Sequence, residues 1–125
     1  MILSNALVAA DYVLIPMMCD SFSEDSAFRT YSICNELRKN SKTNLKGIGV
    51  ILTMVDKGAA TRETREECQR VLGPTLFKTE IPSALAVKTS VRRCVPVCYS
   101  AKTQPIGKSY VAAYKELKQR LEKLD

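Results

Sequence analysis

The stretch that most constrains the fold of this chain is residues 47–56, which read G-I-G-V-I-L-T-M-V-D. It is apolar from Ile48 to Val55, with one glycine and Thr53 as the only interruptions. A strand with one face in water would alternate apolar and polar residues, whereas a short continuous run rich in β-branched residues is typical of a strand covered on both faces. The run therefore predicts a central strand of a parallel sheet, flanked by helices.

Two shorter apolar segments predict further strands, at residues 11–16 (D-Y-V-L-I-P) and 77–82 (F-K-T-E-I-P). Each ends in proline, which we expect to stop the strand. Helical periodicity is found before, between and after these segments, at residues 2–10, 21–38, 61–72 and 109–124. Alternating strands and helices imply right-handed crossovers, so the predicted fold is a three-layer α/β/α domain with three parallel strands.

The remaining boundaries follow from local signals. Ser21 and Glu24 have the spacing of a capping box, which predicts the start of a helix there. Residues 39–44 are polar and predict a turn, and residues 95–99 predict a short edge strand. Residues 83–94 fit neither helix nor strand clearly.

Composition limits the class of protein. A chain of 125 residues with 46% hydrophobic content predicts a single domain spanning residues 1–125. We expect a cytoplasmic protein with no membrane partner, because the sequence has neither a spanning apolar run nor a secretory signal. Five cysteines without a C-x-x-C pair predict reduced, buried thiols.

The chain contains no histidine, which excludes Ser-His and Cys-His couples and removes the commonest zinc ligand. Hydrolase triads are therefore excluded, and we predict neither a catalytic residue nor a metal site in this chain. The formal charge of +6 is unevenly distributed, because residues 83–125 hold nine basic and three acidic side chains while residues 1–82 hold ten of each. Such asymmetry indicates either a surface for a polyanion or simply a solvated basic helix.

Four blocks of this sequence resemble one family, the ParA/Soj partition ATPases, which are relatives of MinD with a deviant Walker motif. The blocks are S-N-A-L-V-A-A-D-Y-V-L-I-P at residues 4–16, G-I-G-V-I-L-T-M-V-D at 47–56, F-K-T-E-I-P at 77–82 and A-Y-K-E-L at 113–117. They resemble the carboxy-terminal half of that family. The resemblance implies part of a P-loop NTPase-like fold and a role in chromosome or plasmid partition.

In that family the Walker A loop, K-G-G-x-G-K-[ST], and the Walker B region precede the first block. The resemblance therefore implies that ATP and Mg²⁺ bind only together with an amino-terminal half, and that this chain alone does not hydrolyse ATP. Gly107, Lys108 and Ser109 read like the tail of a phosphate loop, but Lys102 stands where the first glycine of that motif is required. The start of a helix explains these three residues better.

The resemblance also implies site residues. Family members hold adenine with the segments that follow the strands matching residues 47–56 and 77–82, which points to Asp56 and Pro82. The alternative is that Asp56 only terminates a strand and Pro82 only breaks one. Non-specific DNA binding in the family, together with the basic last third of the chain, points to five residues: Lys88, Arg92, Arg93, Lys102 and Lys108. Lysines and glutamates alternate later in the terminal helix, and we interpret them as a solvated face.

Two hypotheses follow. One is a fragment or truncated member of a partition ATPase, with non-specific DNA and a ParB-like regulator as partners. The other is a non-catalytic α/β interaction domain that associates with itself or with a protein partner. In the family, the strand matching residues 12–15 pairs with a strand from the amino-terminal half. We therefore expect an open edge at residues 12–15 that binds a second copy or a partner, unless residues 17–22 fold over it.

Overall fold

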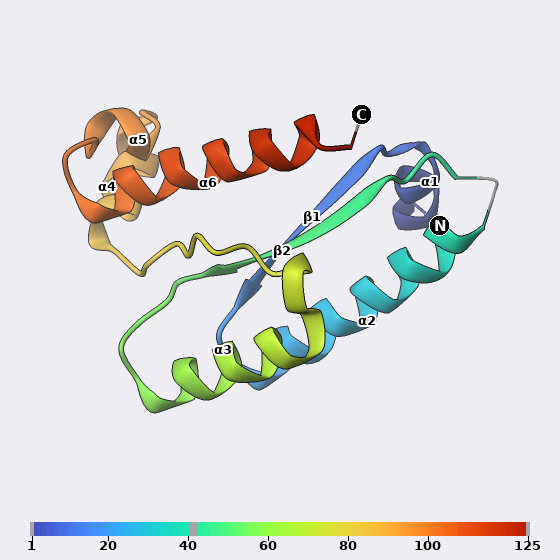
Figure 1. Cartoon of the computed structure of the whole chain (residues 1–125). Helices are drawn as coiled ribbons and strands as arrows, with labels where there is room; N and C mark the ends of the chain where they lie inside the picture. Colours follow the sequence, from blue (N-terminus) through green and yellow to red (C-terminus); the bar gives the residue numbers. More distant parts are fainter. Residues whose placement is uncertain (1, 41–42, 125) are drawn as a thin grey trace.

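The computed structural model describes residues 2–40 and 43–124. Its elements follow one another from α1 to α6 with a single 3-10 turn, η1, after α3 (Figure 1). Their bounds are α1 Ile2–Ala9, β1 Tyr12–Met18, α2 Ser21–Lys39, β2 Gly47–Thr53, α3 Ala59–Leu72, η1 Gly73–Thr75, α4 Leu85–Arg93, α5 Val97–Ser100 and α6 Pro105–Glu122.

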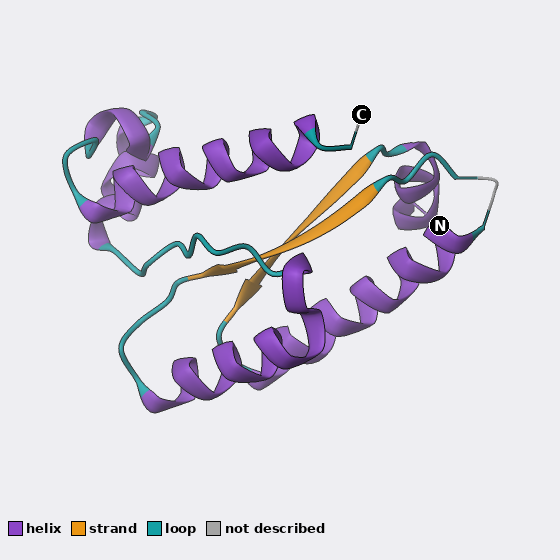
Figure 2. Ribbon diagram, in the orientation of Figure 1, coloured by secondary structure: helices purple, strands orange, loops and turns teal. Residues whose placement is uncertain are grey.

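The two strands form a parallel pair in continuous register, from Tyr12 opposite Gly47 to Met18 opposite Thr53 (Figure 2). The predicted α/β class is thus confirmed. The prediction of a third strand at residues 77–82 is wrong as an element, although the segment does run along the other edge of β2. It contacts β2 only through two isolated parallel bridges, Val50 to Leu76 and Val55 to Pro82.

Helices cover both faces of this small sheet, as the continuous apolar run predicted. One core cluster joins Val50 and Leu52 of β2 to α2 and α3, and the other joins Ile51 to α5 and α6. Figure 2 shows α6 on one side of the strands and α2 with α3 on the other. The first six residues of β2 are all buried.

Gly49 allows the aromatic side chains on the α6 face to pack closely against β2. A Cβ placed on Gly49 would lie 2.4 Å from the Tyr12 hydroxyl and 2.5 Å from Cε1 of Phe77. Both distances are shorter than ordinary contacts of a carbon atom, so a larger residue here would have to displace the Tyr12 and Phe77 side chains. The glycine that interrupts the apolar run therefore has a packing role.

Two predicted boundaries are displaced. Pro16 does not stop β1, which continues to Met18 with Pro16 opposite Ile51. The start of α2 is capped one residue before the predicted box, because the Asp20 carboxylate accepts hydrogen bonds from the backbone N–H and the hydroxyl of Ser23, at 2.7 and 3.1 Å. An aspartate in this position satisfies an amide that has no partner within the helix.

The region after residue 82 is helical. Residues 85–93 form α4, and the predicted edge strand at 95–99 is wrong, because Val97 already begins α5. Pro96 is the N-cap of α5 and lacks the N–H that a strand would need, whereas the first turn of a helix leaves that group unpaired in any case.

The cysteine prediction is only partly right. All five thiols are free, and Cys34 and Cys68 are buried, but Cys94 is exposed. Cys94 ends α4 in the left-handed conformation, with φ of 55°. Among the described residues, no helix is long and apolar enough to cross a membrane.

Candidate functional site

The two residues predicted to hold adenine lie side by side at the carboxyl end of the strands. Val55, which immediately precedes Asp56, pairs with Pro82 in a parallel bridge, and the Ser83 N–H donates to the Val55 carbonyl at 3.0 Å. The structure thus brings Asp56 and Pro82 to the same corner of the fold. This is the edge at which open parallel sheets bind ligands.

Within that corner, Asp56 organises its own loop. One carboxylate oxygen, Oδ1, accepts hydrogen bonds from the Thr61 hydroxyl at 2.6 Å and from the Gly58 N–H at 2.8 Å. The hydrogen bond from Thr61, and to a smaller extent that from Gly58, holds the pKa of Asp56 below its usual value. Asp56 therefore fixes the turn into α3 as an ionised group, and this contact is local.

The five residues predicted to contact DNA are all exposed, on α4 and on the segments that follow it. Residues 81–115 contain no acidic side chain, so no carboxylate within this stretch competes with a bound phosphate. Both arginines, Arg92 and Arg93, occupy the last turn of α4, where the carboxyl end of the helix dipole favours positive charge.

Residues 107–109 do not form a phosphate-binding loop. Gly107 is buried within the first turn of α6, which begins at Pro105. A Cβ on Gly107 would lie 2.1 Å from the carbonyl oxygen of Ala101, so this glycine permits close packing between α5 and α6. Lys108, beside it, is exposed. The interpretation of these residues as a helix start is confirmed.

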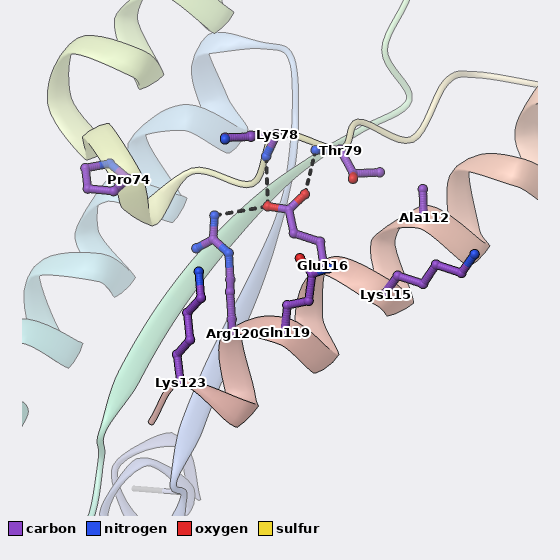
Figure 3. A pocket seen from close by; sticks show the side chains of 9 residues that line it. All are labelled: Pro74, Lys78, Thr79, Ala112, Lys115, Glu116, Gln119, Arg120 and Lys123. Carbon is purple, nitrogen blue, oxygen red and sulfur yellow. Dashed lines mark hydrogen bonds and ion pairs between the residues drawn. The ribbon is translucent and has the colours of Figure 1, made fainter. Parts of the chain in front are cut away.

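Several polar contacts join α6 to residues 75–79, and they were not predicted from sequence (Figure 3). Both oxygens of the Glu116 carboxylate accept backbone hydrogen bonds, from the Lys78 N–H and from the Thr79 N–H, each at 2.9 Å. Arg120 Nη2 also donates to Glu116, at 3.1 Å. Phe77 and Ile81 donate to the carbonyls of Val50 and Leu52, so in a regular strand the Thr79 N–H would also face β2. It bonds to Glu116 instead, and residues 77–82 are therefore not a continuous strand.

Arg120 is held from several sides. Its Nη1 and Nη2 atoms donate to the carbonyls of Thr75 and Leu76, at 3.2 and 3.0 Å, and its guanidinium carbon lies 4.1 Å from the centre of the Phe77 ring. Only 16% of the Glu116 side chain is exposed. Burial opposes ionisation of this carboxyl, but the hydrogen bonds from Thr79, Lys78 and Arg120 outweigh it and lower the pKa of Glu116.

A hollow of about 560 Å³ opens beside this contact, between residues 74–79 and α6. Its charged lining consists of Glu116 and four basic side chains, Lys78, Lys115, Arg120 and Lys123. The sequence pattern placed the α6 lysines on a solvated face, and the i, i+4 pair between Glu116 and Arg120 is indeed present. The pattern could not show that Lys78, 37 to 45 residues earlier in the chain, lines the same hollow as two of these lysines.

Replacing Glu116 with glutamine is expected to lower the free energy of unfolding by about 2 kcal/mol, because an amide group presents one acceptor where the carboxylate presents two. The pKa of Glu116 is lowered on folding, so its contribution is complete above the ordinary value of 4.5 and is lost as pH falls through the lower folded value. Urea unfolding followed by circular dichroism at neutral and acidic pH measures both effects.

The exposed Glu122 of the same helix provides the control for this experiment. Glu122→Gln should change stability by no more than about 0.5 kcal/mol. Equal losses in the two variants, or an undiminished loss of stability below pH 4.5 in Glu116→Gln, would contradict the assigned role.

Comparison with known proteins gives partial similarities. No protein-family profile matches the chain. Residues of this chain are 32% identical to the sporulation initiation inhibitor protein Soj of Bacillus subtilis, over 62% of the chain and 31% of Soj. They are 27% identical to the chromosome partitioning protein ParA of Myxococcus xanthus, over 93% of the chain and 41% of ParA. An uncharacterized protein of Pseudomonas putida is 26% identical, over 96% of the chain and 46% of its own length. The chain thus spans less than half the length of these relatives, and its similarity to Soj and ParA is weak and partial.

Proposed function

We propose that this chain is a partition-protein-like module, related to ParA and Soj, that binds duplex DNA without regard to sequence through α4 and the segments after it. The observation that carries the proposal is the exposed, acid-free basic stretch of residues 81–115. The similarity to a chromosome partitioning protein supports it. On this proposal, the module acts in the cytoplasm, and a ParB-like protein is its regulator.

The physical basis is neutralisation of phosphates. Exposed lysine and arginine side chains contact the DNA backbone, release condensed counterions and read no bases. The proposed contacts are the five predicted residues, Lys88, Arg92, Arg93, Lys102 and Lys108. Such binding weakens steeply with salt, which distinguishes it from recognition of a particular sequence.

Reversing both charges in Arg92→Glu/Arg93→Glu is expected to weaken binding to unrelated duplexes by about tenfold or more and to reduce the salt slope by about 2. Fluorescence anisotropy of labelled duplexes at several salt concentrations measures both quantities. Arg29→Glu/Arg62→Glu is the matched control, because it changes net charge equally at exposed positions of α2 and α3. Equal weakening by the two double variants would leave only a net-charge effect and would refute the α4 surface.

We propose that Asp56 and Pro82 contribute to an adenine pocket, and that triphosphate and Mg²⁺ binding require residues other than these 125. The purified chain is therefore expected to show no ATP hydrolysis above the buffer rate. A coupled phosphate-release assay tests this, with Lys108→Ala as the companion variant. Saturable turnover that Lys108→Ala abolishes would restore residues 107–109 as a phosphate loop and overturn the assignment.

A second candidate function, a protein interaction domain, is favoured by one observation. β1 pairs only with β2 among the described elements, and its side chains Leu14 and Met18 are 38% and 43% exposed. Apolar side chains along a free strand edge are typical of a surface that binds another chain. The experiment that separates this candidate from a monomeric DNA-binding module is an association measurement.

A further inference from the structure

The hollow beside Glu116 lies between residues 74–79 and α6, alongside the middle of β2, where Val50 pairs with Leu76. Through Pro74, Arg120 and Lys123 it continues into a second, smaller hollow of about 260 Å³, which is lined by Tyr12 and Gly47 at the amino ends of β1 and β2. Neither hollow is lined by any residue of α4. Neither hollow is lined by Asp56, by Pro82 or by any of the five proposed DNA contacts, so the site differs from both proposed sites in its residues.

The charged side chains that line the larger hollow give it a net positive charge. The negative charge of Glu116 is matched by Arg120, and both oxygens of that carboxylate are already bonded. Three ammonium groups remain, those of Lys78, Lys115 and Lys123, and among the described residues none of them forms an ion pair with a carboxylate. In Figure 3, the Lys78 and Lys123 side chains reach to either side of the Arg120 guanidinium, whereas Lys115 reaches away from it.

The backbone that carries Lys78 is held against α6 by hydrogen bonds. Glu116 fixes the backbone at Lys78 and Thr79, and Arg120 fixes the backbone at Thr75 and Leu76, so residues 75–79 are tied to α6 by four hydrogen bonds between the two segments. The hollow is thus lined by lysines of two different segments, Lys78 on one side and those of α6 on the other, and their positive charges repel one another. A multiply charged anion bound between the lysines would offset that repulsion, because each ammonium group attracts the anion as a point charge.

We propose that this hollow binds a ligand that carries two or more phosphate groups. Its volume of about 560 Å³ suits a small molecule, and its charged lining selects a polyanion instead of an apolar ligand. The phosphates come either from a free phosphorylated compound or from the backbone of a nucleic acid. Both sources present the same chemistry to Lys78 and Lys123, and competition between them identifies the source.

The experiment titrates inorganic tripolyphosphate into the purified chain and follows binding by isothermal calorimetry and by the change in Tm. Lys78→Gln/Lys123→Gln is expected to weaken binding about tenfold, since each exposed charge contact is worth up to about 1 kcal/mol. Lys118→Gln is the control, because Lys118 is exposed on the same helix but does not line the hollow. It should bind tripolyphosphate like the parent protein.

Circular dichroism and urea unfolding establish that the variants are folded. Undiminished binding by Lys78→Gln/Lys123→Gln, or an equal loss in Lys118→Gln, would overturn the proposal. If a short duplex displaces tripolyphosphate from the parent, the phosphates are those of nucleic acid; if it does not, they belong to a small molecule. Arg92→Glu/Arg93→Glu should keep its affinity for tripolyphosphate, so the proposal for this hollow and the proposal for the α4 surface are tested independently.

Discussion

Gly107→Ala is expected to destabilise the folded chain by about 3 kcal/mol or more, the upper end of what overpacking costs. The added methyl carbon would lie 2.1 Å from the Ala101 carbonyl oxygen and 2.7 Å from its carbonyl carbon. These are backbone atoms, so no side chain can rotate away, and α5 must separate from α6. Ala101 and Ile106, on either side of this contact, are both buried in the core that covers Ile51 of β2.

Glycine-to-alanine changes inside a helix usually stabilise by up to about 1 kcal/mol, so the expected sign is the reverse of the ordinary one. Thermal and urea unfolding measure the loss, and the neighbouring Lys108→Ala should stay within about 0.5 kcal/mol of the parent because Lys108 is exposed. A neutral or stabilising effect of Gly107→Ala would show that the close approach of the two helices is not needed for folding.

The sequence was most informative where one physical requirement acted locally. The apolar run from Ile48 to Val55 predicted a strand covered on both faces, and β2 is such a strand, buried from Gly47 to Leu52. The same holds for the helix at residues 61–72, which the structure extends by two residues to Ala59. Periodicity and run length report burial directly, and burial decided both elements.

Residues 77–82 were predicted wrongly because a tertiary contact determines their structure. The segment has the composition of a strand and lies beside β2, yet a carboxylate 37 and 38 residues further along the chain takes the amides of Thr79 and Lys78. Nothing in the sequence of residues 77–82 indicates that the Glu116 carboxylate will bind these amides. The basic hollow was missed for the same reason, because it combines Lys78 with lysines of α6, and only the tertiary fold brings them together.

Two further predictions had different outcomes. Asp56 and Pro82 were predicted from the family resemblance, and they lie close together because Val55 and Pro82 form a parallel bridge at the carboxyl end of β2. At residues 95–99, by contrast, the valines favoured a strand, and the packing of α5 against α6 prevailed over that preference. Secondary structure at a short segment is decided by its neighbours more than by its own composition.

The free edge of β1 is expected to make the isolated chain self-associate as its concentration rises. The carbonyls of Val50 and Leu52 face residues 77–81, so by alternation along the strands Gly49 and Ile51 bond to β1 through Val13, Ile15 and Met17. The backbone groups of Tyr12, Leu14 and Met18 therefore point outward. No described element pairs with them, and such an edge is a template for another strand.

Two features of the structure refine the prediction made from sequence. Pro16 lies inside β1 and also faces outward, so one donor is missing from the edge and a second strand is held best at Tyr12 and Leu14. Residues 17–22 do not cover the edge, because Met17 and Met18 continue the strand and Phe22 is 85% exposed. A hollow of about 440 Å³, lined by Pro16, Met18 and Phe22, adjoins the edge.

Sedimentation velocity and light scattering over a concentration series measure the association. Leu14→Lys places a charge at the centre of the edge and should raise the dissociation constant about tenfold or more, a change of about 1.4 kcal/mol. Val71→Lys is the control, because Val71 is 43% exposed, close to the 38% of Leu14, but lies on α3. A cooperatively folded chain that stays monomeric at high concentration would rule out self-association. If Leu14→Lys leaves the complex intact, or if Val71→Lys weakens it equally, the contact does not lie on β1.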